Sequence, residues 1–229
     1  MKKIGTLLAV VTMMIYLSGY VQAEQRLSID LRNSDQWDFF EYSRIKPNTY
    51  KFSPQGLMID IQRSASPLFY RFDEPLYISS FQAKAKIFNI NIEKIAALTQ
   101  EKRLSDSPFR VGFVLSGARK LGPFERMIAP TWVKKIFELA PPEVGISHVD
   151  FFSTAWHTAD LNKKQERGYE NLIHESWQAV VEPTGEINMR QKTHFSAPIL
   201  ALWISADGDD LGIDYQVQIQ SLEVEFPDA

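Results

Sequence analysis

The sequence of 229 residues contains no cysteine. The protein therefore cannot form a disulfide, use a thiolate as a nucleophile, or hold zinc or an iron–sulfur cluster through cysteine ligands. A lipid-anchored N-terminus is disfavoured for the same reason, because no thiol is present to carry the lipid. Stability must come from the core alone, which a chain of this length can build.

The chain also lacks an excess of basic charge, a phosphate-binding loop and a helical pair of histidines. The formal net charge of −3 disfavours binding to nucleic acid or to anionic lipid. Gly117 and Gly122 follow a predicted strand, and their spacing is wrong for a loop that cradles phosphates before a helix. No two histidines have the i, i+4 spacing of metal ligands on one helix. The four are His148, His157, His174 and His194.

The most apolar segment lies at the N-terminus. Two lysines precede an uncharged run from Leu7 to Leu17, and small residues at Val21 and Ala23 occupy the positions that a signal peptidase reads. We expect residues 1–23 to be a signal peptide that is cleaved after Ala23. The alternative is an uncleaved anchor, but the run is shorter than the roughly 20 residues that cross a bilayer. The sequence thus predicts a periplasmic or secreted protein of a bacterial cell envelope, without stable membrane insertion after cleavage.

Cleavage would leave residues 24–229, a length that suits one β-sandwich domain. Loss of Lys2 and Lys3 takes the formal net charge from −3 to −5. The hydrophobic fraction of 45% and the charged fraction of 23% are typical of a globular chain. Because no linker, repeat or low-complexity segment is visible, we predict a single domain.

Most of this segment alternates apolar and polar residues with a period of two. Strands of this kind are predicted at 27–31, 49–52, 57–62, 68–72, 77–88, 147–156, 171–181, 187–192 and 215–226. In the last of them the alternation changes phase near Gln220 and Ser221, which predicts a β-bulge. The segments 110–115 and 198–204 are apolar at nearly every position, as expected for central strands covered on both faces.

Two segments have helical spacing instead. Residues 92–104 and 130–139 carry apolar stripes, and Pro141 and Pro142 end the second. The polar stretch 158–170 is predicted to be a solvated loop. Many short strands with two helices predict a mainly antiparallel β-sandwich of jelly-roll type with two peripheral helices.

No residue can be assigned a catalytic role. Ser64 and Ser66 lack the flanking glycines of a nucleophile elbow. Three carboxylates, Asp207, Asp209 and Asp210, surround a glycine and could supply oxygen ligands to calcium, the one cofactor we consider. The alternative is an ordinary turn, since no glutamate completes the calcium-loop consensus.

A tryptophan near a polar loop is the second candidate site. Trp156 ends a predicted strand, and His157 follows it directly. An exposed indole could stack on a sugar ring while His157 fixes hydroxyl groups. The alternative is that Trp156 belongs to the core.

Several short segments resemble the DUF3047 family of exported bacterial proteins. They are Trp37 to Phe40, Thr49 to Phe52, Leu57 to Ile61, Ser64 to Ser66 and Ala201 to Asp210. The resemblance covers the two ends of the chain better than the middle. It implies a fold similar to galactose-binding-like jelly rolls, and it carries over no catalytic residue.

Three functions remain open at this point. The first is a non-catalytic envelope protein that binds a carbohydrate or glycan. The second is a structural module that binds another envelope protein through a sheet edge or the helix-bearing face. The third is a hydrolase whose carboxylate pair the sequence does not identify. The first rests mainly on analogy of fold.

Overall fold

The computed structural model describes residues 24–102 and 107–227. The predicted signal peptide and the predicted end of the first helix at Leu104 lie outside the described residues. Cleavage after Ala23 therefore stays a prediction.

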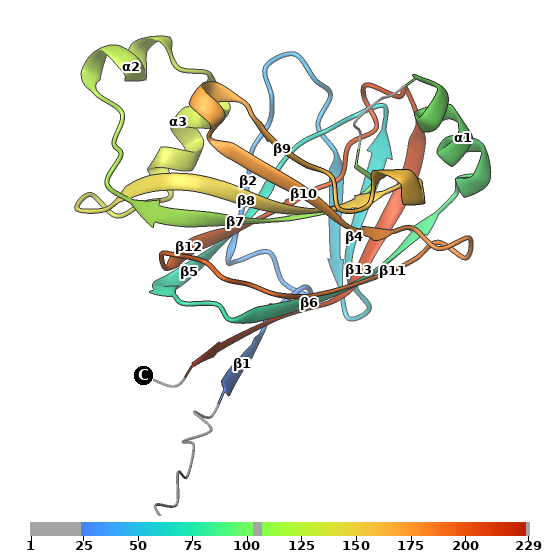
Figure 1. Cartoon of the computed structure of the whole chain (residues 1–229), viewed down its shortest axis with the longest axis horizontal. Helices are drawn as coiled ribbons and strands as arrows, with labels where there is room; N and C mark the ends of the chain where they lie inside the picture. Colours follow the sequence, from blue (N-terminus) through green and yellow to red (C-terminus); the bar gives the residue numbers. More distant parts are fainter. Residues whose placement is uncertain (1–23, 103–106, 228–229) are drawn as a thin grey trace, which may run out of the picture.

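Two β-sheets pack face to face, and Figure 1 shows them edge-on. The first, sheet A, consists of β1 (Glu24–Ser28), β3 (Thr49–Ser53), β4 (Gly56–Gln62), β6 (Ser80–Phe88), β11 (Glu186–Lys192) and β13 (Asp214–Pro227). The second, sheet B, consists of β2 (Trp37–Phe39), β5 (Leu68–Leu76), β7 (Arg110–Gly117), β8 (Gly145–Ala155), β9 (Lys164–Arg167), β10 (Ile173–Val180) and β12 (Ile199–Ser205). The predicted β-sandwich is confirmed.

The order of the strands is that of a jelly roll. Sheet A contains the run β4-β13-β6-β11, and sheet B contains β5-β12-β7-β8. Along the chain, β4, β5, β6 and β7 alternate between the two sheets, and so do β11, β12 and β13. This is the double Greek key of eight strands that defines the jelly roll, so the predicted topology is confirmed as well.

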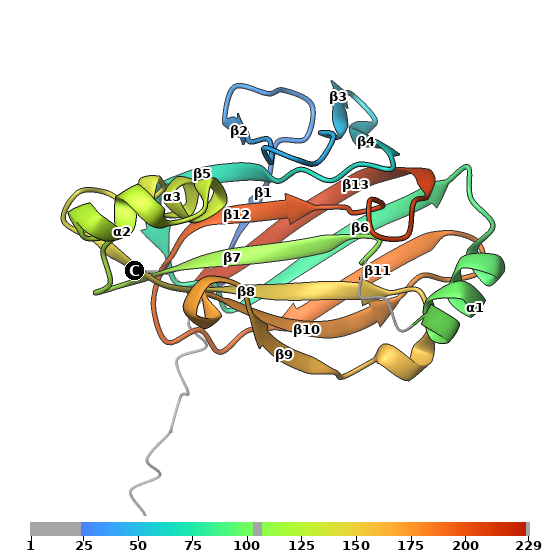
Figure 2. The same cartoon turned by 90° about the horizontal axis from the view of Figure 1, so that it is seen from above.

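In residues 24–102 and 107–227, three α-helices accompany the sheets. They are α1 (Ile92–Lys102), α2 (Pro123–Ile128) and α3 (Thr131–Glu138). Two 3-10 turns, η1 (Thr158–Asp160) and η2 (Tyr169–Asn171), flank β9. Two of the α-helices fall in the predicted segments, and α2 was not predicted. Figure 2 shows α2 and α3 over one end of sheet B and α1 at the opposite end of the molecule.

The apolar residues form two clusters, one on each face of sheet B. The larger cluster fills the space between the sheets. The smaller one lies on the outer face of sheet B, where Val133 and Ile136 of α3 cover Val114, Phe151 and Trp203. All seven residues of β12 are buried. The prediction that this strand is covered on both sides is therefore confirmed.

Register shifts on β13 and β12 change which side chains point inward. The pairing of β13 with β6 shifts between Ile219 and Ser221, which confirms the predicted bulge. Gly56 lies against it, because a Cβ there would come within 2.1 Å of the Ile219 carbonyl oxygen. A second shift follows Ile199 on β12 and places Leu200 in the outer cluster, although simple alternation predicts it on the face of Leu202.

Sheet B is wider than one sheet of an eight-stranded jelly roll, because β9 and β10 extend it. Strand β10 pairs with β8 in parallel, whereas β9 pairs with β10 in the antiparallel sense. The expectation of a loop across 158–170 is corrected at this point, since β9 lies within it.

Among the described residues, no helix is long and apolar enough to cross a membrane.

Candidate functional site

A small cleft opens on the outer face of sheet B, beside α3. Its volume is about 180 Å³. Side chains of β7, β8, β9, β10 and β12 form its floor and walls, together with α3 and the loop after β2. The lining residues are Tyr42, Arg110, Trp132, Phe151, Arg167, Gly168, Ile173, Trp203, Ser205 and Asp207. We call this hollow the arginine cleft.

Glu175 lies beneath the polar side of the arginine cleft and holds its arginines. Its side chain is 0% exposed. One carboxylate oxygen accepts from Arg110 Nε at 2.7 Å and from the Ser153 hydroxyl at 2.6 Å. The other accepts from Arg167 Nε at 2.8 Å and from the Gln165 amide at 3.1 Å. Four donors thus satisfy the carboxylate, which fixes both arginines in place.

Glu175 is ionised at neutral pH despite its burial. Burial favours the neutral acid, but the charges of Arg110 and Arg167 and the bonds from Ser153 and Arg167 outweigh it. Together they lower the pKa of Glu175 to about 2. A buried carboxylate held by two arginines forms a fixed, charged base for the cleft.

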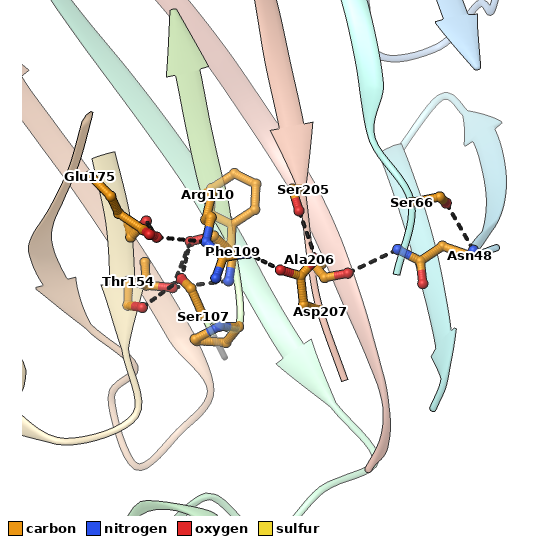
Figure 3. A network of polar contacts seen from close by, with 12 residues as sticks. Asn48, Ser66, Ser107, Phe109, Arg110, Thr154, Glu175, Ser205, Ala206 and Asp207 are labelled. Carbon is orange, nitrogen blue, oxygen red and sulfur yellow. Dashed lines mark hydrogen bonds and ion pairs between the residues drawn. The ribbon is translucent and has the colours of Figure 1, made fainter. Parts of the chain in front are cut away.

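Asp207 completes the cluster on the opposite side of Arg110, as Figure 3 shows. Its carboxylate pairs with Arg110 Nη1 and accepts from the Ser205 hydroxyl at 2.7 Å. Its side chain is 18% exposed, compared with 6% for Arg110. Asp207 therefore faces the cleft more openly than the arginine that it pairs with.

The segment that carries Asp207 is held by buried hydrogen bonds to the start of the chain. Asn48 Nδ2 donates to the Ala206 carbonyl at 2.9 Å (Figure 3). Asn48 Oδ1 accepts from the Ser64 hydroxyl at 2.7 Å. The Ser66 hydroxyl accepts from the Asn48 amide nitrogen at 2.9 Å. Ser64 and Ser66 thus have a structural role.

A second set of bonds fixes the start of β7, where Arg110 lies. The Ser107 hydroxyl donates to the Thr154 carbonyl at 2.7 Å, and the Phe109 amide nitrogen donates to the Thr154 hydroxyl at 3.0 Å (Figure 3). These buried bonds tie β7 to β8. As a result Arg110 projects from a rigid strand and not from a loop.

Aromatic side chains form the apolar wall of the cleft. Trp132 on α3 lies 6.4 Å from Trp203 on β12, measured between ring centroids, and Phe151 meets Trp203 edge-on at 4.9 Å. The Trp132 ring also packs over Gly168, where a Cβ would come within 3.2 Å of it. Gly168 has φ +80°, so glycine is favoured there for its backbone as well.

Two polar aromatic groups also border the cleft. Burial raises the pKa of Tyr42 to about 12, so its phenol stays protonated and can donate. The indole nitrogen of Trp203 is buried, and it donates to no acceptor within the part of the chain that the structure describes. Both groups are hydrogen-bond donors next to a charged floor.

The cleft combines balanced charge with aromatic surface. Arg110 and Arg167 offset Glu175 and Asp207, so a bound molecule needs no net charge to compensate them. The volume is below the range of about 300–1,000 Å³ for pockets that take drug-sized ligands. It therefore suits a single small polar ring, held by hydrogen bonds below and apolar contact at the side.

The structure corrects the expectation of an exposed Trp156. This side chain is 3% exposed and lies in the cluster between the sheets. It meets Tyr215 edge-on, with ring centroids 5.6 Å apart. No face of the indole is open to a sugar, and the alternative of a core role is the one that the structure supports.

His157 has a local structural contact. Its Nδ1 accepts from the Ala159 amide nitrogen at 2.9 Å, which caps η1. It is absent from the residues that line the arginine cleft. The predicted pair of Trp156 and His157 is therefore not brought together as a binding site.

The three carboxylates predicted to bind calcium do not converge. Among the described residues, only one group of three or more His, Asp or Glu has ligand atoms within 4.8 Å of one another, and it includes none of Asp207, Asp209 and Asp210. Asp207 pairs with Arg110 instead, and burial raises the pKa of Asp209. The calcium expectation is corrected to a turn whose first residue belongs to the arginine cleft.

Sequence reasoning missed most of the residues in the cleft. Arg110 begins an apolar strand, and Glu175 takes a buried position in the alternation between Ile173 and Trp177. A charged residue at a buried position is a signal in itself, because such groups need partners. That signal was present in the sequence, but the identity of the partners depends on the pairing of distant strands.

A second, larger hollow lies at the open edge of the sandwich, with a volume of about 690 Å³. Strands β9 and β10 extend sheet B past the edge strand β11 of sheet A, and the hollow lies between them. We call it the edge pocket. Its walls include the exposed side chains of Lys192 and His194 as well as the rings of Phe152 and Phe195. Glu175 lines this pocket, whereas Arg110 and Arg167 do not.

No family model and no curated protein matches the chain. Among solved structures it is similar to a xylan-binding module, CBM15, with 8% identity and a TM-score of 0.41 over 89% of this chain and 97% of that one. An agarase matches with 9% identity and a TM-score of 0.39 over 89% of this chain and 25% of that one. The Emp47p carbohydrate recognition domain matches with 10% identity and a TM-score of 0.33 over 88% and 95%. At these scores the likenesses carry no argument about function, which rests on the site.

Proposed function

We propose that the protein is an exported, non-catalytic glycan-binding protein of a bacterial cell envelope, and that the glycan lies in the arginine cleft. One observation carries the proposal. A charge-balanced cluster of Arg110, Arg167, Asp207 and the buried Glu175 lies beside the rings of Trp132 and Tyr42. Membership of the DUF3047-type family and export through residues 1–23 belong to the same proposal.

This arrangement matches the surface of a neutral pyranose. The ring hydroxyls of a sugar both donate and accept, so they can bond to the Asp207 carboxylate and to the Arg167 guanidinium together. The apolar face of the ring can pack against the half-buried Trp132. Because Glu175 holds the arginines before any ligand arrives, little ordering cost accompanies binding.

The ionisation of Glu175 bears on the hydrolase hypothesis. A glycosidase needs one carboxyl group that stays protonated as the general acid. The pKa of Glu175 is lowered to about 2, and all of its oxygens already accept from protein donors. Glu175 is therefore suited to positioning Arg110 and Arg167 and not to proton transfer.

A glycan array with bacterial envelope and plant polysaccharides tests the proposal. We expect the wild-type protein to bind a defined subset, and Trp132→Ala to lose that binding with an unchanged far-UV circular dichroism spectrum. Phe124→Ala is the matched control, because this aromatic residue lies on the neighbouring α2 and is 67% exposed, outside the cleft. A blank array with folded wild-type protein would contradict the proposal.

One observation favours the second function, a module that binds an envelope protein. Helix α2 exposes Phe124, Met127 and Ile128, with exposed fractions of 67%, 69% and 57%. Contiguous apolar side chains on a surface helix are a common feature of protein interaction sites. A blank glycan array would leave this helix-bearing face as the favoured site of interaction.

A further inference from the structure

Two histidines and an aspartate meet on the strands that border the edge pocket. His148 and Asp150 lie two residues apart on β8, so they point to the same face of the sheet. On the adjacent parallel strand β10, His174 pairs in register with Asp150. Their side chains are 19%, 28% and 38% exposed, and Asp150 and His174 line the edge pocket.

The distances between these groups are unusual for direct hydrogen bonds. Asp150 Oδ1 lies 3.4 Å from His148 Nε2 and 3.6 Å from His174 Nδ1. Hydrogen bonds between nitrogen and oxygen are about 2.7–3.2 Å long. Bonds of about 2.0–2.1 Å from zinc to tetrahedral ligands place neighbouring ligand atoms about 3.3 Å apart. The spacing thus fits ligands that share one ion better than groups that bond to one another.

The outer contact of His148 agrees with a shared ion. His148 Nδ1 lies 2.8 Å from the Ser147 hydroxyl, which engages that nitrogen and leaves Nε2 facing Asp150. Such an outer hydrogen bond is typical of histidines that bind metals. The two imidazole rings are stacked with centroids 4.1 Å apart and planes 26° apart. Because the lone pairs lie in the ring planes, rotation about the Cβ–Cγ bond, a soft torsion, has to accompany binding of one ion by both rings.

We propose that His148, Asp150 and His174 bind a divalent transition-metal ion, with Zn²⁺ as the best fit. Two imidazoles and one carboxylate suit Zn²⁺, Co²⁺ or Ni²⁺, whereas Ca²⁺ and Mg²⁺ prefer sites made of oxygen ligands. Three protein ligands leave one tetrahedral position open. Because Asp150 and His174 line the edge pocket, water or a ligand oxygen from the pocket can complete the coordination. The site is separate from the arginine cleft.

Titration calorimetry of the purified, untagged protein with ZnCl₂ tests the proposal. We expect one Zn²⁺ per chain and a rise in melting temperature with added Zn²⁺, because the ion binds the native state. His148→Ala and His174→Ala should each weaken binding by about ten-fold or more, at least the effect of losing an outer-shell partner. His157→Ala is the matched control, since this histidine lies outside the group and should keep the wild-type affinity.

Two further measurements distinguish this site from non-specific binding. Far-UV circular dichroism checks that each variant is folded. If His174→Ala does not fold, His174→Gln takes its place, because glutamine is closer in size to histidine. Co²⁺ bound to the wild-type protein should give the visible absorption of a four-coordinate ion. The proposal is overturned if no Zn²⁺ binds, or if both folded His148 and His174 variants bind it as tightly as the wild type.

Discussion

At the scale of single residues, Glu175 is the most consequential ionisable group. Its pKa is lowered from 4.5 to about 2 by Arg110 and Arg167, against the effect of burial. A carboxylate of lowered pKa stabilises the native state fully above pH 4.5, and the contribution is lost as the pH falls toward 2. At about 1.4 kcal/mol for each pKa unit, the fall from 4.5 to about 2 corresponds to about 3–4 kcal/mol.

This linkage predicts how a Glu175→Gln variant behaves. At pH 7 the variant should be less stable than the wild type, and the difference should shrink between pH 5 and pH 3 as Glu175 loses its advantage. Urea denaturation at several pH values measures it. Glu74→Gln, at an exposed position on β5, is the control and should change little. A Glu175→Gln difference that stays constant over this range would contradict the assignment of a lowered pKa.

Substitution of Trp156 and of Trp132 should have opposite effects on stability and on glycan binding. Trp156 is 3% exposed in the core, so Trp156→Ala should cost about 3–5 kcal/mol of unfolding free energy. Trp132 is half-buried, so Trp132→Ala should cost less stability and should abolish glycan binding. Thermal and urea denaturation give the stabilities. A near-normal fold with lost glycan affinity in Trp156→Ala would restore the role first predicted for it.

Residues that act locally could be predicted better than residues that act through distant partners. The alternation around Trp156 left a core role open, and the structure supports that alternative. Asp207 was selected as a polar residue, but its partner Arg110 lies 97 residues away along the chain. The sequence did not show that His148 and His174 lie together for the same reason, because no local spacing reveals the pairing of β8 with β10.

At the scale of elements, β12 is the most sensitive to a polar substitution. Leu202 is fully buried on the face between the sheets. Leu202→Asp should prevent folding, because it places an unpaired carboxylate in a strand that is covered on both sides. Far-UV circular dichroism and size-exclusion chromatography measure the outcome. Lys51→Asp on the edge strand β3 is the control, since its exposed side chain should tolerate the charge. A folded, soluble Leu202→Asp protein would contradict the burial of β12.

The long strands were predictable, whereas the short polar ones were not. Alternation of period two indicated most strands of the jelly roll, and continuous apolar runs indicated β7 and β12. The phase change at Gln220 and Ser221 indicated the bulge. Strands β2 and β9 have three and four residues, too few for a periodic pattern. The parallel pairing of β10 with β8 depends on how the chain crosses over in space, and no local pattern reports that.

At the scale of the whole molecule, export is the prediction that concerns the N-terminus. We expect the mature protein to begin at Glu24, because a positive start, an apolar run and small residues at Val21 and Ala23 precede it. N-terminal sequencing of the protein isolated from its host decides it. Recovery of an intact Met1 in the cytosol would contradict export and would weaken the proposed role in the envelope.

The central claim is that a glycan binds in the arginine cleft, and the indole signals of the protein test it most directly. The chain has five tryptophans, each with one indole N–H resonance in a ¹⁵N–¹H correlation spectrum. The probe is a mixture of soluble oligosaccharides from hydrolysed bacterial envelope and plant polysaccharides. Titration should shift the signals of Trp132 and Trp203, because both residues line the cleft. The signals of Trp156 and Trp177 should stay unchanged, because these residues are buried outside the cleft. Five unchanged signals, or shifts at Trp156 and Trp177 without shifts at Trp132 and Trp203, would contradict the claim.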